Sequence, residues 1–136
     1  MDEILKKYPN DVKVVIKNFP LSFHKQARRA AQYSLAAHRQ GKYKEMYHAI
    51  FEEYRKLKSN EDLPVEIAER LGLDMEKFKR DANDPEIDAQ IQKEFDQMRN
   101  SGIPRLSVPK FLVAGKEPQG RDIATFSKMI DEALKK

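Results

Sequence analysis

The chain of 136 residues contains no cysteine. Without a thiol it forms no disulfide, offers no thiolate nucleophile and binds no metal through sulfur. The usual sequence evidence for a reducing or an oxidising compartment is therefore missing, and the localisation stays open. Thiol chemistry of every kind is excluded for these 136 residues.

Long hydrophobic runs are also missing. No apolar stretch approaches the roughly 20 residues of a membrane span. The first residues, MDEILKK, lack the apolar stretch of a secretory signal peptide. We therefore expect no membrane partner and no signal peptide within this chain.

Neither sign of charge is in large excess, since 26 lysines and arginines face 22 aspartates and glutamates. A nucleic-acid-binding protein normally gathers its cations on one face or in one run. Here only short basic clusters occur, at residues 25–29 and 55–58. We interpret both clusters as solvated helix faces and expect no nucleic-acid partner.

Residues that commonly carry catalysis or bind metals are few and scattered. The three histidines, His24, His38 and His48, lack the spacing with further ligands that a metal site needs. No glycine-rich phosphate loop occurs, and the acidic residues within 45–53 lie at spacings typical of surface ion pairs. We predict no catalytic residue, no metal site and no cofactor within this chain.

The sequence predicts three short strands and seven helices, with most of the helices lying between the first and second strands. β-Branched runs predict strands at residues 11–18 and 110–113, and a short edge strand is predicted at 117–119. Apolar residues at helical spacing predict helices at 1–8, 22–40, 42–57, 64–71, 75–83, 85–100 and 122–135. This order predicts one α/β domain over residues 1–136, with a small mixed sheet and a helical insertion at about residues 22–101.

Local signals mark the ends of several helices. We expect Ser22 and Asp74 to cap the helices that follow them, and Pro85 to occupy the first turn of its helix. A turn is predicted at residues 114–116. An aromatic stripe at helical spacing is more typical of a packed core than of a ligand box, and we predict core positions for its members, Tyr43, Tyr47, Phe51 and Tyr54.

The most distinctive run is SVPKFLVAG at residues 107–115. Proline cannot donate to a strand ladder, so Pro109 is expected where a loop enters a strand. Only bonds that precede proline adopt the cis form cheaply. The Val108–Pro109 bond is therefore predicted to be a candidate cis peptide.

Several short motifs, taken in order, resemble the DsbA-like branch of the thioredoxin superfamily. The motifs are NFPL at residues 18–21, His24 with spaced alanines at 27, 30 and 31, GKYKEM at 41–46, LGLD at 71–74, and the run from Gly102 through Val108 and Pro109 to Gly115. Each motif is weak alone, but their order and spacing span nearly the whole chain. The resemblance implies a thioredoxin-like α/β fold in a thiol:disulfide oxidoreductase family whose members are usually periplasmic or extracytoplasmic.

The front of the family pattern has no counterpart here. The family begins with a central strand and a Cys-x-x-Cys motif, and this chain enters the pattern inside the following helix, at Met1 or Asp2. The resemblance therefore implies a truncated domain whose first, central strand is missing. Thiol–disulfide exchange needs a thiolate, so the activity of the family does not carry over to residues 1–136.

The missing strand would lie between the two predicted strands at 11–18 and 110–113. Unpaired backbone groups cost about 1–3 kcal/mol each when buried without a partner. Three outcomes are open: the two strands pair directly, another copy fills the gap, or a longer protein supplies the strand. Because open apolar edges aggregate, we expect a homo-oligomer or a rearranged sheet.

Two functional hypotheses follow, and the question of enzymatic activity is left open. In the first, the chain is a fragment, or the product of a gene with a misassigned start, of an oxidoreductase whose activity belongs to the longer parent. In the second, it is a redox-inactive module that binds extended peptides or unfolded protein segments, or dimerises. The resemblance implies that Val108 and Pro109 contact the peptide. No residue argues for an enzyme of another class, such as a glutathione-type transferase.

Overall fold

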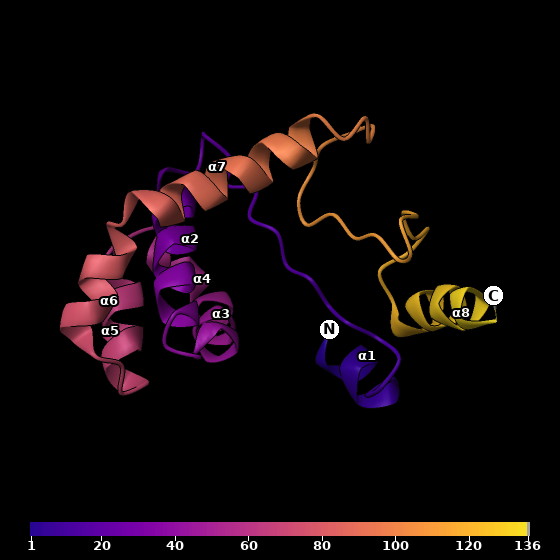
Figure 1. Ribbon diagram of the computed structural model, residues 1–136, viewed down its shortest axis with the longest axis horizontal. Coiled ribbons are helices and arrows are strands. Elements are labelled where there is room, and N and C mark those ends of the chain that lie inside the picture. The colour runs from indigo at the N-terminus through magenta and orange to yellow at the C-terminus, as the bar shows by residue number, and fades with distance from the viewer. Residues whose placement is uncertain (136) are drawn as a thin grey trace. The chain divides into compact units, whose positions relative to one another are not determined.

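The computed structural model of the chain describes residues 1–135, which form eight α-helices (Figure 1). The helices are α1 (Asp2–Lys7), α2 (Lys25–His38), α3 (Tyr43–Glu52), α4 (Tyr54–Leu57), α5 (Leu63–Arg70), α6 (Met75–Ala82), α7 (Pro85–Arg99) and α8 (Ile123–Leu134). The chain divides into two compact units. We call Lys17–Ile103 the helical unit, and Met1–Ile16 together with the chain from Pro104 onwards the terminal unit. The single domain with an insertion at about 22–101 stays a prediction.

The helical unit is built around α2, which packs against α3, α5, α6 and α7. Alanines of α2 and larger apolar side chains from the other helices form its core. The side chains with the least exposure are Ala36, Ala37, Met46, Ile67, Ala68, Phe78, Ala82 and Ile91. Small residues on α2 let the neighbouring helices approach closely, which explains why one helix supports four others.

Polar caps explain where several helices begin. The Asp74 carboxylate accepts the backbone N–H of Lys77 at 3.0 Å and starts α6, as predicted. Pro85 occupies the first turn of α7, also as predicted. The cap predicted at Ser22 is wrong, because α2 begins at Lys25 and makes no side-chain cap bond.

The terminal unit joins the two ends of the chain. Helices α1 and α8 are in contact, and their small core consists of Ile4, Tyr8, Phe126 and Ile130. The Tyr8 hydroxyl donates to the Asp131 carboxylate at 2.8 Å, which ties the end of α1 to α8. Asp122 caps α8 by accepting the backbone N–H of Thr125 at 2.8 Å.

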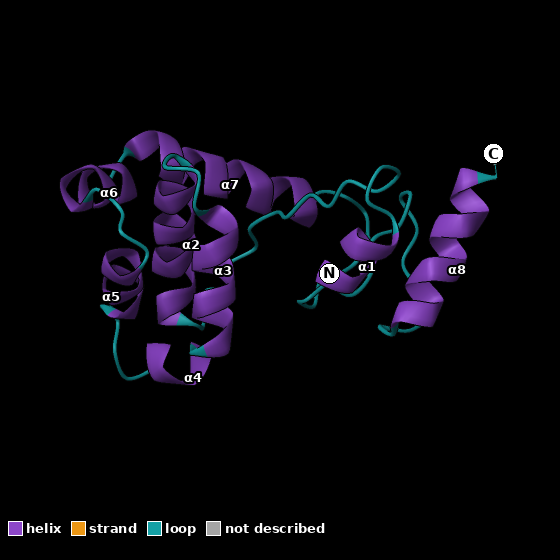
Figure 2. Ribbon diagram, turned by 90° about the horizontal axis from the view of Figure 1, so that it is seen from below, coloured by secondary structure: helices purple, strands orange, loops and turns teal. Residues whose placement is uncertain are grey.

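The predicted α/β fold with a small mixed sheet is wrong for the part of the chain that the structure describes. Residues 1–135 contain helices and loops but no sheet, and their only β pairing is an isolated bridge between Val113 and Lys116 (Figure 2). The predicted strands at 11–18, 110–113 and 117–119 are irregular backbone. Direct pairing of the first two segments, one of the outcomes left open by the sequence, is not found in residues 1–135.

The physical reason is that a strand is stabilised by its neighbours and not by its own residue preferences. The β-branched side chains of Val15 and Ile16 are 64% and 42% exposed, so no sheet surface covers them. At Asn18 the backbone N–H donates instead to the Glu94 carboxylate on α7, at 2.7 Å. The segment is therefore loop backbone without a ladder partner.

The aromatic stripe is only partly core. Met46, on the same helix, is fully buried, whereas Phe51 and Tyr54 are 67% and 57% exposed. Tyr43 is half-buried and packs edge-on against His38, with ring centroids 5.9 Å apart. The core prediction therefore fails for the C-terminal half of the stripe.

Phe78 and Phe51 form a matched pair for testing the core of the helical unit. Phe78 has no exposed surface and stacks on Tyr33 with centroids 5.3 Å apart. We expect Phe78→Ala to lower the free energy of unfolding by about 3–5 kcal/mol through lost burial and the cavity left behind. Phe51→Ala should change it by less than about 0.5 kcal/mol. Urea unfolding followed by circular dichroism measures both, and equal losses would contradict this core.

Tyr43 makes the free energy of unfolding of the helical unit depend on pH in the alkaline range. Burial raises the pKa of Tyr43 to about 12, and the negative charges of ionised Tyr47 and Glu94 add to the effect. The ordinary value is about 10, so the folded state keeps a proton that the unfolded state has lost. This contribution to stability is complete below about pH 10 and is lost as the pH rises towards 12. Urea midpoints should therefore fall more between about pH 10 and 12 in the wild type than in Tyr43→Phe. Equal falls in the two proteins would contradict the assignment.

Candidate functional site

Val108 and Pro109 lie on the surface of the terminal unit, in the loop that leads to α8. Val108 is 41% exposed, Pro109 is also exposed, and the bond between them is cis, as predicted. The Pro109 carbonyl accepts a hydrogen bond from the Arg121 guanidinium at 3.0 Å. The same guanidinium lies 5.9 Å from the centre of the Phe111 ring. Arg121 thus fixes the backbone on the C-terminal side of Pro109.

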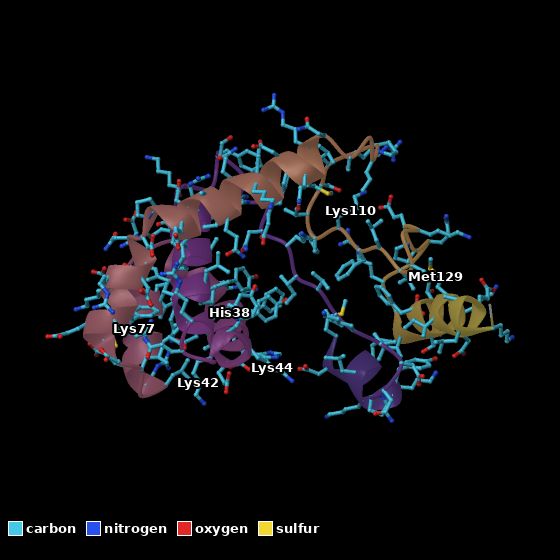
Figure 3. The ribbon with its side chains drawn as sticks, viewed as in Figure 1. His38, Lys42, Lys44, Lys77, Lys110 and Met129 are labelled. Atoms are coloured by element: carbon cyan, nitrogen blue, oxygen red, sulfur yellow. The ribbon has the colours of Figure 1, made fainter. Side chains whose placement is uncertain are left out.

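Lys110, the next residue of this loop, has a side chain that is almost fully buried, which is unusual for a lysine (Figure 3). Only 8% of its side-chain surface is exposed, and its ammonium group lies 2.7 Å from the Glu117 carboxylate. The ion pair spans the turn between the two residues. The positive charge of Lys110 is therefore already compensated within the loop.

A tight turn follows. Val113 and Lys116 exchange two backbone hydrogen bonds, of 2.8 and 3.0 Å. Ala114 and Gly115 between them have φ values of 48° and 80°, the left-handed region that a two-residue turn of type I′ requires at both central positions. The turn predicted at residues 114–116 is confirmed, although the strands that it was expected to join are absent from the described chain.

A groove of about 300 Å³ lies in the terminal unit. Its two walls are residues 11–15 and residues 110–114, the two segments predicted as strands. Ile4 of α1 and Phe126 and Ile130 of α8 also line it. The second wall begins directly after Pro109, so the predicted peptide-contacting pair lies at one end of that wall.

In both walls, covered and exposed side chains alternate along the chain as they do in a β-strand, although no sheet is present in the described residues. In the first wall Val12 and Val14 are half-buried, and Val15 is exposed. In the second wall Phe111 and Val113 pack against the core of the terminal unit, together with Val12, while Leu112 is 48% exposed. This period of two is the pattern of a pleated strand with one covered face.

The backbone of the walls is largely unpaired. Within residues 1–135, neither the N–H nor the C=O groups of residues 13–16 and 110–112 take part in any hydrogen bond. Both walls therefore carry donors and acceptors that water satisfies in the free protein.

The described part of the chain does not assemble a metal centre. No group of three or more histidine, aspartate or glutamate side chains within residues 1–135 is arranged to hold a metal ion. His24 packs beside Phe23, with centroids 4.6 Å apart, and is at the N-cap of α2 without a side-chain cap bond. None of the eight helices described is long and apolar enough to cross a membrane.

One titratable group near the site has a perturbed pKa. The Thr125 hydroxyl and backbone N–H both donate to the Asp122 carboxylate and hold its pKa below the ordinary value. Asp122 therefore stays ionised in the pH range where most proteins work, and α8 keeps its cap there. Because α8 lines the groove, this cap supports the site without taking part in chemistry.

Sequence reasoning located one end of the candidate site and the position of the gap beside it. The family resemblance implied that Val108 and Pro109 contact a peptide. It also placed a missing strand between residues 11–18 and 110–113, and three ways of closing that gap were left open. We did not expect the gap to remain as an open groove. Nothing in the sequence indicated the roles of Arg121 and the buried Lys110, because an isolated basic residue is normally expected to be exposed on the surface.

Comparison with known proteins identifies the family. Residues 1–131 match the family of the DSBA-like thioredoxin domain, and the chain belongs to that family. No curated protein and no solved structure matches the chain. This member has no cysteine, so residues 1–136 contain no Cys-x-x-Cys redox site.

Hydrogen exchange of the free protein tests the unpaired walls. We expect the amides of residues 13–16 and 110–112 to exchange at rates close to those of an unfolded chain, because no hydrogen bond protects them. The buried amides of Leu35, Ala36 and Ala37 in α2 serve as the internal control and should be strongly protected. Protection of both walls to the level of α2 would show that a sheet exists and would refute the description given above.

Proposed function

We propose that this chain is a DsbA-like domain that binds extended peptide segments at Val108 and Pro109 without thiol–disulfide exchange. The single observation that carries the proposal is the exposed, apolar Val108 beside a Pro109 carbonyl already held by Arg121, in a family member without sulfur nucleophiles. Binding is then the part of the family's activity that this chain retains.

The chemistry of the chain favours binding over catalysis. Disulfide exchange proceeds through attack by a thiolate on a disulfide sulfur, and the only sulfur atoms here are those of five methionines. A methionine thioether has no proton to lose and cannot take that role. The hypothesis of a redox-inactive module is therefore the one that residues 1–136 support by themselves.

The surface around Val108 suits an extended peptide. An exposed valine offers apolar contact, and the neighbouring backbone of residues 110–112 carries free donors and acceptors. Main-chain hydrogen bonds combined with a side-chain contact are the usual means by which a protein edge recognises an extended segment. The compensated charge of Lys110 places no electrostatic demand on the peptide.

Binding can be measured with a fluorescein-labelled, permanently unfolded, carboxymethylated protein as the probe. We expect the wild type to bind this probe and Val108→Asp to bind at least about tenfold more weakly, because a carboxylate at an apolar contact must be desolvated. Phe23→Asp is the matched control: it places the same charge on an apolar side chain that is 75% exposed in the helical unit. Fluorescence anisotropy gives the dissociation constants.

The contradicting outcomes are distinct. A wild type that does not bind the probe would refute peptide binding. Equal affinities of Val108→Asp and the wild type would place the binding surface elsewhere, and an equal loss in both variants would show that contact is unspecific. Disulfide reduction assayed on the same samples should be at the level of buffer, since the chain has no thiol.

A further inference from the structure

The helical unit contains a groove of its own, of about 430 Å³, which takes no part in the proposed function. Residues of α2, α5 and α6 line it, and these three helices pack against one another (Figure 2). Small-molecule sites in proteins have volumes of about 300–1,000 Å³. The groove is therefore large enough for a small ligand, and a single unit of the chain forms it.

Tyr33 brings a hydroxyl group without a partner to this groove. The residue is only 7% exposed, and its ring packs against Phe78 and against the Arg29 guanidinium, which lies 4.4 Å from the ring centre. Within residues 1–135 the Tyr33 hydroxyl takes part in no hydrogen bond, and the one unbonded side-chain oxygen there that is fully sealed is that of Ser127. The Tyr33 hydroxyl is therefore accessible from the groove. Because a buried tyrosine hydroxyl normally has a hydrogen-bond partner, it points to a partner from outside the chain.

Arg29, which also lines the groove from α2, has an unoccupied pair of donors. Its Nη1 donates to the Gln32 side chain at 3.0 Å and to the Ala82 carbonyl at 3.1 Å, and these bonds hold the guanidinium in place. Its Nε and Nη2 have no acceptor in the described chain. In the neighbouring Arg28 the same two nitrogens both donate to the Asp88 carboxylate, each at 2.8 Å. The free pair on Arg29 therefore suits a carboxylate, which a guanidinium binds through two parallel hydrogen bonds.

Carboxylates line the groove along α5. Asp62, Glu66 and Glu69 all contribute to the lining, and the spacing i, i+4, i+7 puts them on one face of the helix. Glu66 accepts a hydrogen bond from the Asn60 amide at 2.9 Å, whereas the carboxylates of Asp62 and Glu69 have no partner within residues 1–135. The acidic side chains of the described chain are not arranged to hold a metal ion. The two free carboxylates therefore suit two organic cations, such as ammonium groups.

We propose that this groove binds a free α-amino acid with a basic side chain, of which lysine is the probe. The donor pair of Arg29 and the Tyr33 hydroxyl hold the carboxylate of the ligand. Its α-ammonium and side-chain ammonium groups pair with Asp62 and Glu69.

The charge of the lining selects a basic amino acid over a neutral or an acidic one. Three carboxylates and two cations, Arg29 and Lys79, line the groove, which leaves one net negative charge. A ligand with two ammonium groups and one carboxylate has a net charge of plus one and neutralises the site. This proposal does not rest on peptide binding, because Val108 and Pro109 belong to the terminal unit.

Ligands that differ from lysine by one group test the proposal in NMR titrations of the isotope-labelled full chain at constant ionic strength. We expect L-lysine to shift the amide signals of residues 65–69 and 79–83. Cadaverine lacks the carboxylate, L-norleucine lacks the side-chain ammonium, and Nα-acetyl-lysine lacks the α-ammonium, as does the C-terminal lysine of a polypeptide. Each of these three should bind at least about tenfold more weakly than lysine, because one charged contact is lost.

Conservative substitutions test the individual contacts. Arg29→Lys keeps the charge but loses the donor pair, so it should weaken lysine binding at least about tenfold and leave the weak binding of cadaverine unchanged. Tyr33→Phe removes only the hydroxyl and should weaken lysine binding about fivefold. Glu69→Gln should weaken it at least about fivefold. Its matched control, Glu52→Gln, removes an exposed carboxylate of α3 that does not line the groove and should have no effect. The amide spectrum of each variant checks its fold, and the ligand series on the wild type decides the matter if Arg29→Lys unfolds.

The contradicting outcomes are specific. A wild type that does not bind lysine would overturn the proposal, and so would equal affinities for lysine and either cadaverine or norleucine. Equal affinity for Nα-acetyl-lysine would replace the free amino acid by the C-terminus of a polypeptide. Equal losses in Glu69→Gln and Glu52→Gln, or signal shifts confined to the terminal unit, would place the binding outside this groove. None of these results changes the affinity for the unfolded-protein probe at Val108, so the two proposals fail separately.

Discussion

An extended backbone must find hydrogen-bond partners along its edges, and this requirement governs the structure described here. Two segments, at 11–15 and 110–114, have the residue alternation of strands and cover α1 and α8 on one face. Within residues 1–135 their backbone groups are paired only at the bridge between Val113 and Lys116 and at Val12, whose N–H donates to the Tyr8 carbonyl at 3.3 Å. The unpaired edges leave a groove in place of a sheet. The exposed Val108 and the Pro109 carbonyl held by Arg121, on which the proposed function rests, lie just before one wall of that groove.

The helical unit meets the same requirement differently. Its helices satisfy their own backbone groups, and the core around α2 adds burial that does not depend on the terminal unit. Where extended backbone enters this unit, at Asn18, the Glu94 carboxylate accepts both its backbone and its side-chain N–H groups. A single acidic side chain thus replaces a ladder partner, and the helical unit is complete where the terminal unit is not.

This chain belongs to the DSBA-like thioredoxin domain family but has no cysteine. Peptide binding and thiol–disulfide exchange can therefore be considered separately in it. The family match covers residues 1–131, so the elements that surround a bound peptide in this account lie within it.

The sequence predicted the parts that depend on local signals: the cap at Asp74, the start of α7 at Pro85, the turn at Ala114 and Gly115, and the cis bond before Pro109. It failed for the sheet, because strand formation depends on partners that lie far away in sequence or on other chains. It failed at Ser22 as well, where the chain enters α2 three residues later without a side-chain cap. The resemblance placed a gap between the two segments, but that it stays open as a groove did not follow from the sequence, because pairing depends on partners far away in the chain or on other chains.

Infrared spectroscopy of isotope-labelled protein mixed with unlabelled peptide tests the central claim most directly, because the label separates the amide bands of the two partners. The account predicts a helical spectrum without a β-sheet band for the free protein, and a sheet band in both the protein and the peptide when the complex forms. A sheet band already present in the free protein, or a complex in which neither partner gains one, would contradict it.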